Sequence, residues 1–210
     1  MLEILEKREI LKNKKFQIKI NKMIPSKSGL GGGSMNAASI LGYFIKKKEI
    51  KISYKELNKI CKLIGSDVIL GIKQSNCIMN LENKIKYFHN YRKLHTLIIK
   101  PNFGCSTKDI YSKVRRFDRA KFQKPNKKMF NLDFLIKMNN SLESIAFSKY
   151  PKLKSIKFYL QNSLNPVFVR MTGSGSALVA YYKSKERCEN ARKKFSKKYK
   201  NYWCIASKTI

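Results

Sequence analysis

Residues 24–38 read Ile24-Pro25-Ser26-Lys27-Ser28-Gly29-Leu30-Gly31-Gly32-Gly33-Ser34-Met35-Asn36-Ala37-Ala38, a run that holds four of the ten glycines in the chain. A backbone without Cβ atoms can bend closely around an anion and direct successive N–H groups at it. A helix that follows such a loop adds the positive end of its dipole. The run therefore has the composition of a phosphate-binding loop, although a flexible glycine linker has the same composition.

The flanking sequence favours a binding loop over a linker. Upstream, Phe16, Ile18 and Ile20 alternate with polar residues, which predicts a half-buried strand over residues 16–21. Downstream, apolar residues recur at helical spacing and predict a helix from Ser34 to about Lys47. The run does not fit the two common nucleotide motifs, because it lacks the Lys-Ser/Thr pair of a P-loop and the spacing of a dinucleotide-binding loop.

The composition indicates a globular protein. The 210 residues are 43% hydrophobic and 11% aromatic, which is enough for a substantial core in one large or two small domains. No run is long and apolar enough for a membrane span, and residues 1–13 do not resemble a signal peptide. We therefore expect a cytoplasmic protein. Its five cysteines are widely spaced and odd in number, which favours buried reduced thiols.

The chain carries a formal net charge of +33, which raises the hypothesis of nucleic-acid binding. However, only eight of the 46 basic residues are arginines, and arginine is the residue that dedicated phosphate and base readers prefer. Lysines spread along the whole chain, together with abundant Ile and Asn, are more typical of a coding-composition bias, and local runs such as Lys46-Lys47-Lys48 are typical of solvated helix ends. A basic nucleic-acid-binding protein, in which the glycine loops are only structural, remains the alternative from another functional class.

The periodicity of the rest of the chain predicts alternating helices and strands. Residues 1–12 predict a helix, and Ser53-Tyr54-Lys55-Glu56 is a capping box that opens another helix, to about Ile64. The other predicted helices lie at 132–147, 151–162 and 185–199, with a short helical segment after Asp67. The other predicted strands lie at 76–81, 84–88, 94–100, 167–171, 177–182 and 202–207, with a polar connector at 90–92 and a basic loop over 117–130.

Two further features could carry chemistry. Met171-Thr172-Gly173-Ser174-Gly175-Ser176 lies between two predicted strands, where its simplest interpretation is a hairpin turn, but its small hydroxyl residues could also converge on a ligand. Asp67 is one of only 13 acidic residues. Its carboxylate could hold Mg²⁺ or accept a proton beside bound phosphates, but its spacing alone favours a helix cap before Val68.

In this order along the chain, five motifs resemble the GHMP kinase superfamily. They are residues 25–38, Gly65-Ser66-Asp67-Val68, Pro101-Asn102-Phe103-Gly104-Cys105-Ser106-Thr107, Asn140-Ser141-Leu142-Glu143 and the turn at 171–176. The resemblance implies an α+β fold with two lobes, the second a small split β-α-β sandwich. It implies a boundary that separates an N-terminal ATP-binding domain, residues 1–92, from a C-terminal domain, residues 93–210.

The resemblance also implies a reaction and its residues. ATP, with Mg²⁺, would phosphorylate the 2-hydroxyl of 4-diphosphocytidyl-2-C-methyl-D-erythritol in non-mevalonate isoprenoid biosynthesis. Asp67 would be the catalytic base. The ATP-phosphate loop would consist of Pro25, Ser26, Lys27, Ser28, Gly29, Leu30, Gly31, Gly32, Gly33, Ser34 and Met35. The substrate-side loop would consist of Thr172, Gly173, Ser174, Gly175 and Ser176.

The sequence departs from the family pattern at three residues and at its start. Met35 stands where the family usually has a second serine, Ser141 replaces a common Asp, and Ile69 replaces the usual Pro after Asp67-Val68. The family also begins with further strands that carry a catalytic lysine and an acceptor-binding segment, and this chain starts after them. We therefore expect an incomplete first lobe and almost no activity from these 210 residues alone. A GHMP kinase that acts on another small alcohol remains a second alternative.

Overall fold

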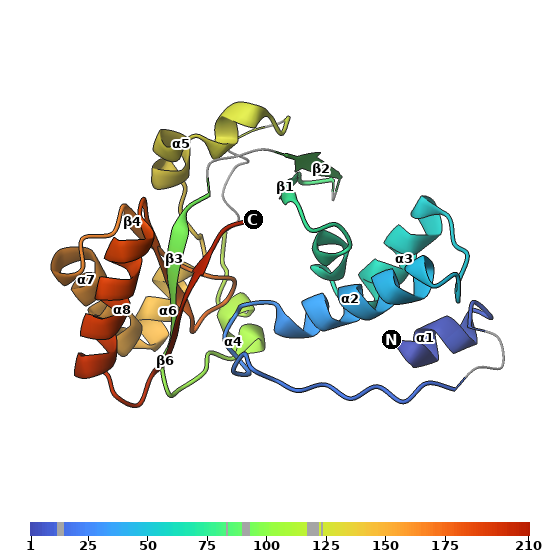
Figure 1. Cartoon of the computed structure of the whole chain (residues 1–210), viewed down its shortest axis with the longest axis horizontal. Coiled ribbons are helices and arrows are strands. Elements are labelled where there is room, and N and C mark those ends of the chain that lie inside the picture. The colour runs from blue at the N-terminus through green and yellow to red at the C-terminus, as the bar shows by residue number, and fades with distance from the viewer. Residues whose placement is uncertain (12–14, 83, 90–92, 117–121, 123) are drawn as a thin grey trace. The chain divides into compact units, whose positions relative to one another are not determined.

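The computed structural model describes residues 1–11, 15–82, 84–89, 93–116, 122 and 124–210 (Figure 1). Its contacts divide the chain into two compact units. The first unit contains Met1–Ile24 and Gly31–Ser75, and the second contains Pro25–Leu30 and Asn76–Ile210. The domain boundary between residues 92 and 93 stays a prediction. The predicted connector at 90–92 lies outside the described residues, as do Lys12 and residues 117–121 and 123 of the predicted basic loop.

The first unit is helical. Its elements are α1 (Leu2–Lys7), α2 (Gly32–Lys46), α3 (Tyr54–Ile64) and the 3₁₀ helix η1 (Val68–Gly71). The apolar faces that the periodicity predicts bury Leu5, Leu41, Phe44 and Ile60. The predicted capping box is confirmed in part, since the side chain of Ser53 accepts a hydrogen bond of 3.2 Å from the Glu56 N–H. Removal of large apolar side chains from water stabilises this small unit.

The strand predicted over residues 16–21 is wrong. The segment has no regular secondary structure, and no described strand pairs with it. Ile18 and Ile20 are 38% and 48% exposed, whereas the Phe16 ring packs against that of Phe44 in a tilted arrangement, with ring centroids 4.6 Å apart. A strand needs the main-chain groups of a neighbour, and the alternation of side chains cannot supply that neighbour.

The second unit is built around a four-stranded sheet. Its strands are β3 (His95–Lys100), β4 (Phe168–Met171), β5 (Leu178–Tyr182) and β6 (Trp203–Lys208). They lie in the order β4-β5-β3-β6, and every neighbouring pair is antiparallel. The arrangement is the split β-α-β topology that was predicted, because β3 inserts between β5 and β6, which α8 connects along the chain. A separate antiparallel hairpin consists of β1 (Asn76–Met79) and β2 (Ile85–Phe88).

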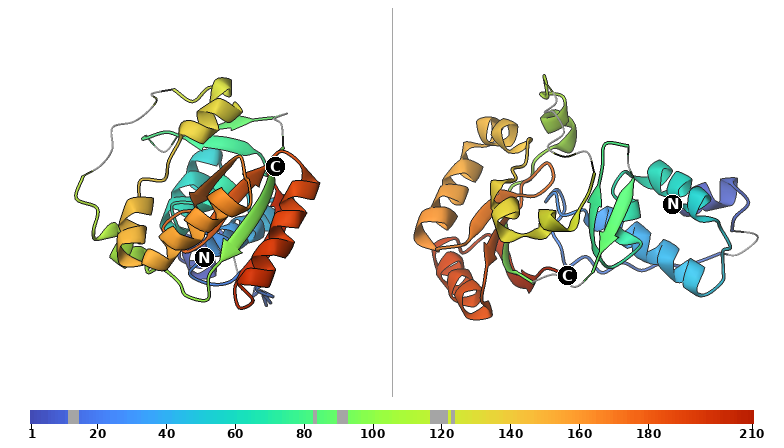
Figure 2. Two further views of the ribbon diagram at one scale, coloured as in Figure 1. Left: turned by 90° about the vertical axis from the view of Figure 1, so that its left-hand side faces the viewer. Right: turned by 90° about the horizontal axis from the view of Figure 1, so that it is seen from above.

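Two long helices cover one face of this sheet. They are α7 (Pro151–Ser163) and α8 (Lys185–Lys198), which lie beside the strands in Figures 1 and 2. Leu153, Ile156 and Leu160 of α7 and Phe195 of α8 are buried in one core with alternate residues of the strands. The period of two in a strand sends Leu97 and Ile99 of β3 to this face. This packed core gives the strand ends and their connecting turns fixed positions.

The remaining helices of this unit are short. They are α4 (Thr107–Tyr111), the 3₁₀ helix η2 (Lys127–Phe130), α5 (Leu132–Lys137) and α6 (Glu143–Lys149). The prediction of one helix over 132–147 is wrong, because the chain leaves helical geometry between Met138 and Leu142. The Asn140 side chain accepts the Leu142 N–H at 3.0 Å and donates to the carbonyls of Met171, at the end of β4, and of Gly173, in the turn that follows, so distant partners interrupt the helix. The helix α4 was not predicted.

All five cysteines have free thiols, and Cys61, Cys105 and Cys188 are buried, as predicted. None of the described helices combines the length and the apolar composition that a membrane crossing requires.

Candidate functional site

The first turn of α2 is open. Gly31 is the residue before the helix, in left-handed geometry with φ of 68°, and no side chain caps the helix. The N–H groups of the first turn therefore lack partners within the helix and point outward at its positive end. Apart from the adjacent residues and the backbone of the helix itself, no described atom lies within 4 Å of the place that a Cβ would occupy at Gly31, Gly32 or Gly33. The turn offers both hydrogen-bond donors and room for an anion.

Asp67 lies in the same unit, on a segment that passes the start of α2. A Cβ at Gly65 would lie 3.8 Å from the Ser34 hydroxyl oxygen. A Cβ at Gly71 would lie 2.8 Å from the Met35 sulfur, so η1 packs directly on α2. The segment that carries Asp67 is thus fixed against the first two turns of α2.

The interpretation of Asp67 as a helix cap, which its spacing alone favoured, is wrong. Asp67 precedes η1, but its carboxylate accepts no capping hydrogen bond from the backbone. Its Oδ1 accepts a bond of 3.3 Å from the Ser66 hydroxyl, and the residue is exposed to solvent. Because the Asp67 carboxylate caps no helix, it is free to accept a proton or to bind a cation.

The first part of the glycine-rich run belongs to the second unit, where it packs against the second glycine turn. The hydroxyl of Thr172 donates a bond of 3.0 Å to the Gly29 carbonyl, and the Ala177 N–H donates one of 2.8 Å to the Ser28 carbonyl. The approach is so close that a Cβ at Gly29 would lie 2.4 Å from the Thr172 carbonyl oxygen. The two glycine-rich motifs therefore contact each other at residues 28–29.

The other hydroxyls of the turn also contact the protein. The Ser174 and Thr107 hydroxyls share a hydrogen bond of 2.9 Å, and the fully buried Ser176 hydroxyl donates one of 2.8 Å to the Phe103 carbonyl. The turn is a hairpin connection, as its simplest interpretation had it, and it also joins three segments that the resemblance had singled out. Any ligand that it binds would meet main-chain groups more readily than these hydroxyls.

A side-chain network supports the turn from the α5–α6 connection. Asn140 donates to the carbonyls of Met171 and Gly173, at 2.9 and 2.7 Å. Glu143 accepts the Met171 N–H at 2.8 Å through one oxygen and pairs with Lys157 at 2.5 Å through the other. Asn140 and Glu143 belong to one of the five motifs that resemble the family, but no sequence pattern predicts their hydrogen bonds to the β4–β5 region.

A cavity of about 580 Å³ lies beside this network. Tyr111, Asn140, Arg170 and Thr172 contribute to its lining. The Arg170 guanidinium donates to the carbonyls of Leu135, at 2.5 Å, and Met138, and burial lowers its pKa. The cavity offers an aromatic ring, amide groups and a cation to a polar ligand. Neither Tyr111 nor Arg170 was predicted, and no sequence pattern distinguishes them from ordinary surface residues.

The described residues contain no group of three His, Cys, Asp or Glu side chains that could hold a metal ion. A Mg²⁺ ion that arrives with a nucleotide needs no such group, since it keeps phosphate and water oxygens and takes only one or two ligands from the protein. Ser34 and Asp67, both in the first unit, are oxygen donors of this kind.

Models of two protein families match the chain. The model described as GHMP kinases N terminal domain matches residues 1–80, and the one described as GHMP kinases C terminal matches residues 114–201. A curated relative from Pelagibacter ubique, 4-diphosphocytidyl-2-C-methyl-D-erythritol kinase, is 53% identical over the whole chain, which spans 75% of the relative's length. The enzyme of the same name from Petrotoga mobilis is 33% identical and matches 84% of the chain and 71% of its own length.

Two solved structures share the fold. A crystal structure of 4-(cytidine 5'-diphospho)-2C-methyl-D-erythritol kinase superposes with a TM-score of 0.69 at 22% identity, and the match covers 89% of this chain and 68% of that one. Homoserine kinase from Cytophaga hutchinsonii superposes with a TM-score of 0.67 at 13% identity, with 90% and 68% covered. The mixed α+β architecture with two parts is therefore the one expected from the sequence.

Proposed function

The chain belongs to the GHMP kinases, a family that uses ATP, and we propose that it phosphorylates the 2-hydroxyl of 4-diphosphocytidyl-2-C-methyl-D-erythritol. The observation that carries this proposal is the 53% identity, over all 210 residues, to the Pelagibacter ubique kinase of that substrate. The open first turn of α2 and the uncommitted Asp67 carboxylate support it independently.

The residues of the first unit would divide the chemistry between them. The N–H groups at Gly32, Gly33 and Ser34 would hold phosphate oxygens, because their positive helix end favours negative charge. With ATP bound, Mg²⁺ would take Ser34 as a ligand and neutralise phosphate charge. The loop from Pro25 to Met35 would follow the triphosphate, with residues 28–29 anchored by the turn at 172–177.

The reaction needs a proton acceptor, and Asp67 would fill that role. The oxygen of the acceptor hydroxyl forms a bond to the γ-phosphorus, while the bond between that phosphorus and the β,γ-bridging oxygen breaks and ADP leaves. The hydroxyl proton passes to the Asp67 carboxylate. In the second unit, the polar cavity beside the turn at 172–176 has a lining that matches the amide, hydroxyl and phosphate groups of the acceptor.

A radiolabel assay tests the proposal. The full chain is incubated with γ-labelled ATP, Mg²⁺ and the acceptor, and labelled product is separated from ATP. We expect slow but measurable transfer, which Asp67→Asn lowers by about 100-fold or more, since general base catalysis commonly contributes that much. Glu6→Gln, which removes an exposed carboxylate from α1 in the same unit, is the matched control and should leave the rate unchanged.

The same preparation discriminates against nucleic-acid binding. Steep salt-dependent DNA binding that is indifferent to ATP and to Asp67→Asn, in a chain that transfers no label, would overturn the kinase proposal. ATP that protects the chain from proteolysis, with protection lost in Gly32→Val, supports it. Transfer to another small alcohol but not to 4-diphosphocytidyl-2-C-methyl-D-erythritol would contradict the proposed acceptor alone.

A further inference from the structure

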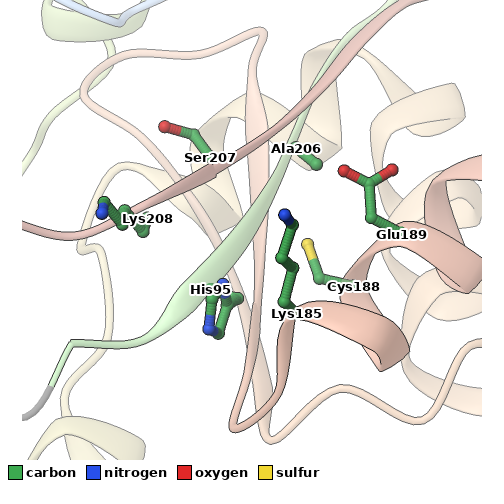
Figure 3. A pocket seen from close by; sticks show the side chains of 7 residues that line it. All are labelled: His95, Lys185, Cys188, Glu189, Ala206, Ser207 and Lys208. Atoms are coloured by element: carbon green, nitrogen blue, oxygen red, sulfur yellow. The ribbon is translucent and has the colours of Figure 1, made fainter.

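A second cavity lies in the second unit, at the end of the sheet that is remote from the glycine turn. Its volume is about 390 Å³, and its walls come from the start of β3, the end of β6 and the first turn of α8. Figure 3 shows His95 on β3, Lys208 on β6, and Lys185, Cys188 and Glu189 on α8 around it. A cavity of this size can hold a small organic molecule.

The strand register places this cavity away from the glycine turn at 172–176 of the same unit. His95 lies opposite Tyr182 on one side and Lys208 on the other. Tyr182 ends β5, whereas the turn at 172–176 precedes the opposite end of that strand, at Leu178. The length of β5 therefore separates the cavity from the turn. The two cavities share no lining residue, so a ligand here would not occupy the acceptor cavity.

The charges around the cavity are predominantly positive. Lys185 and Lys208 come from different elements, and neither has an ion pair with another described residue. Glu189 is the acidic residue of the lining, and Arg192 engages it at 2.8 Å. That hydrogen bond lowers the pKa of Glu189, so the carboxylate stays ionised and its charge is balanced by the guanidinium. Lys185 also lies near enough to Glu189 to contribute to the lowered pKa of that carboxylate, so the lining as a whole keeps a net positive charge, with Lys208 on the opposite wall.

The floor of the cavity is apolar and contains a protonated thiol. Ala206 and the buried Cys188 contribute to it, and burial raises the pKa of Cys188 to about 11. The thiol therefore carries no charge that would oppose an anion at neutral pH.

We propose that this cavity is a binding site for a small organic oxyanion, that is, a phosphate ester or a carboxylate. Lys185 of α8 and Lys208 of β6 would hold the oxyanion, and His95 of β3 would lie beside it. Two ammonium groups from separate elements grip an oxyanion through charge-assisted hydrogen bonds. The apolar floor accommodates a short carbon chain, and a bare ion would leave this part of the cavity unfilled. The site is independent of the proposed kinase activity, because none of its residues is assigned to that reaction.

Histidine makes the test specific, because the chain has only two histidines, His89 and His95. The imidazole resonances of the full chain are recorded by NMR during titration with inorganic phosphate and, separately, with succinate, against sodium chloride of equal ionic strength. The variant His89→Gln assigns the two signals. We expect a saturable shift of the His95 signal with at least one probe, and the probe that binds identifies the headgroup as phosphate or carboxylate.

Paired lysine variants complete the experiment. Lys185→Gln/Lys208→Gln should weaken binding by about tenfold or more, because charged partners make the strongest hydrogen bonds to an oxyanion. Lys194→Gln/Lys200→Gln removes the same charge from exposed positions outside the cavity and should change the affinity less than about twofold. Equal weakening in both pairs, or no saturable shift of His95 with either probe, would overturn the proposal. If the first pair fails to fold, Lys208→Gln alone gives the same comparison.

Discussion

The hydroxyl of Thr172 donates a hydrogen bond of 3.0 Å to the main-chain carbonyl of Gly29, 143 residues earlier in the chain. The Ala177 N–H and the Ser28 carbonyl form a second bond beside it, at 2.8 Å. Two glycine-rich segments that are far apart in the sequence thus meet through their backbones. Gly29 is a glycine for steric reasons, because its φ of +72° and the nearby carbonyl leave no room for a side chain.

We predict that Gly29→Ala destabilises the second unit strongly. A Cβ at this position would lie 2.4 Å from the Thr172 carbonyl oxygen, and the positive φ adds strain. The expected loss is at least about 2 kcal/mol of unfolding free energy, measured by urea denaturation. Gly42→Ala, inside α2 with no atom within 4 Å of the new Cβ, is the control and should stabilise by about 0.5–1 kcal/mol. A similar effect of both substitutions would contradict the steric argument.

Local patterns predicted the parts of the fold that local forces determine. The apolar period of α2, the Ser53 cap and the strands of the central sheet were predicted to within a few residues of their observed bounds. The failures came where a distant group decides. Asn140 interrupts a helical pattern to reach carbonyls of the β4–β5 connection, and residues 16–21 have a strand pattern but no described strand beside them.

The sequence does contain a signal for α4, which was not predicted. The helix α4 begins after Ser106, whose side chain accepts the Asp109 N–H at 3.3 Å. A serine followed three residues later by an acidic residue is a recognised signal for a helix start, so this element could have been predicted. The partners of Glu143 and Arg170 had no such signal, since both depend on contacts with residues more than ten positions away.

A second prediction concerns Glu143, which binds two groups at once. Its side chain is 14% exposed, and it accepts the Met171 N–H while it pairs with Lys157. Glu143→Ala leaves a mostly buried ammonium and a main-chain donor without a partner, so we expect a loss of about 2–4 kcal/mol in unfolding free energy. Glu82→Ala, which breaks the exposed pair with Lys84, should cost less than about 1 kcal/mol.

The double variant Glu143→Ala/Lys157→Met separates the two contributions. If the buried unpaired ammonium is the main cost, the double variant recovers part of the stability that Glu143→Ala loses. No recovery would mean that the hydrogen bond to Met171 dominates. A loss below about 1 kcal/mol in Glu143→Ala itself would show that the β4–β5 connection does not depend on this carboxylate.

Alkaline pH should destabilise the fold through its buried thiols. Burial raises the pKa of Cys61, Cys105 and Cys188 from 9.0 to about 11. Below pH 9 these thiols are protonated in the folded and unfolded chains alike. Between pH 9 and 11 the unfolded chain loses the protons while the folded chain keeps them, so the free energy of unfolding falls as the pH rises.

Urea unfolding at a series of pH values from 8 to 11 measures this dependence. The limiting slope is about 1.4 kcal/mol per pH unit for each thiol that titrates only in the unfolded chain. The variants Cys61→Ala and Cys188→Ala should each show a shallower decline than the parent chain, because lysine and tyrosine titration is common to all three. Parallel declines would show that the thiols do not contribute.

The first turn of α2 gives a prediction in which stability and ligand affinity move in opposite directions. At Gly33 the described atoms leave open space around a new Cβ, and alanine is the better helix former, so Gly33→Ala should raise the unfolding free energy by up to about 1 kcal/mol. If this turn holds the phosphates of ATP, the same methyl group occupies space that a phosphate oxygen needs, and ATP affinity falls by about tenfold or more. Thermal unfolding with and without Mg-ATP measures both effects on one sample. A variant that gains stability and keeps its ATP affinity would exclude the α2 terminus as the phosphate site, whereas Gly42→Ala, farther along the same helix, should gain stability and bind ATP like the parent chain.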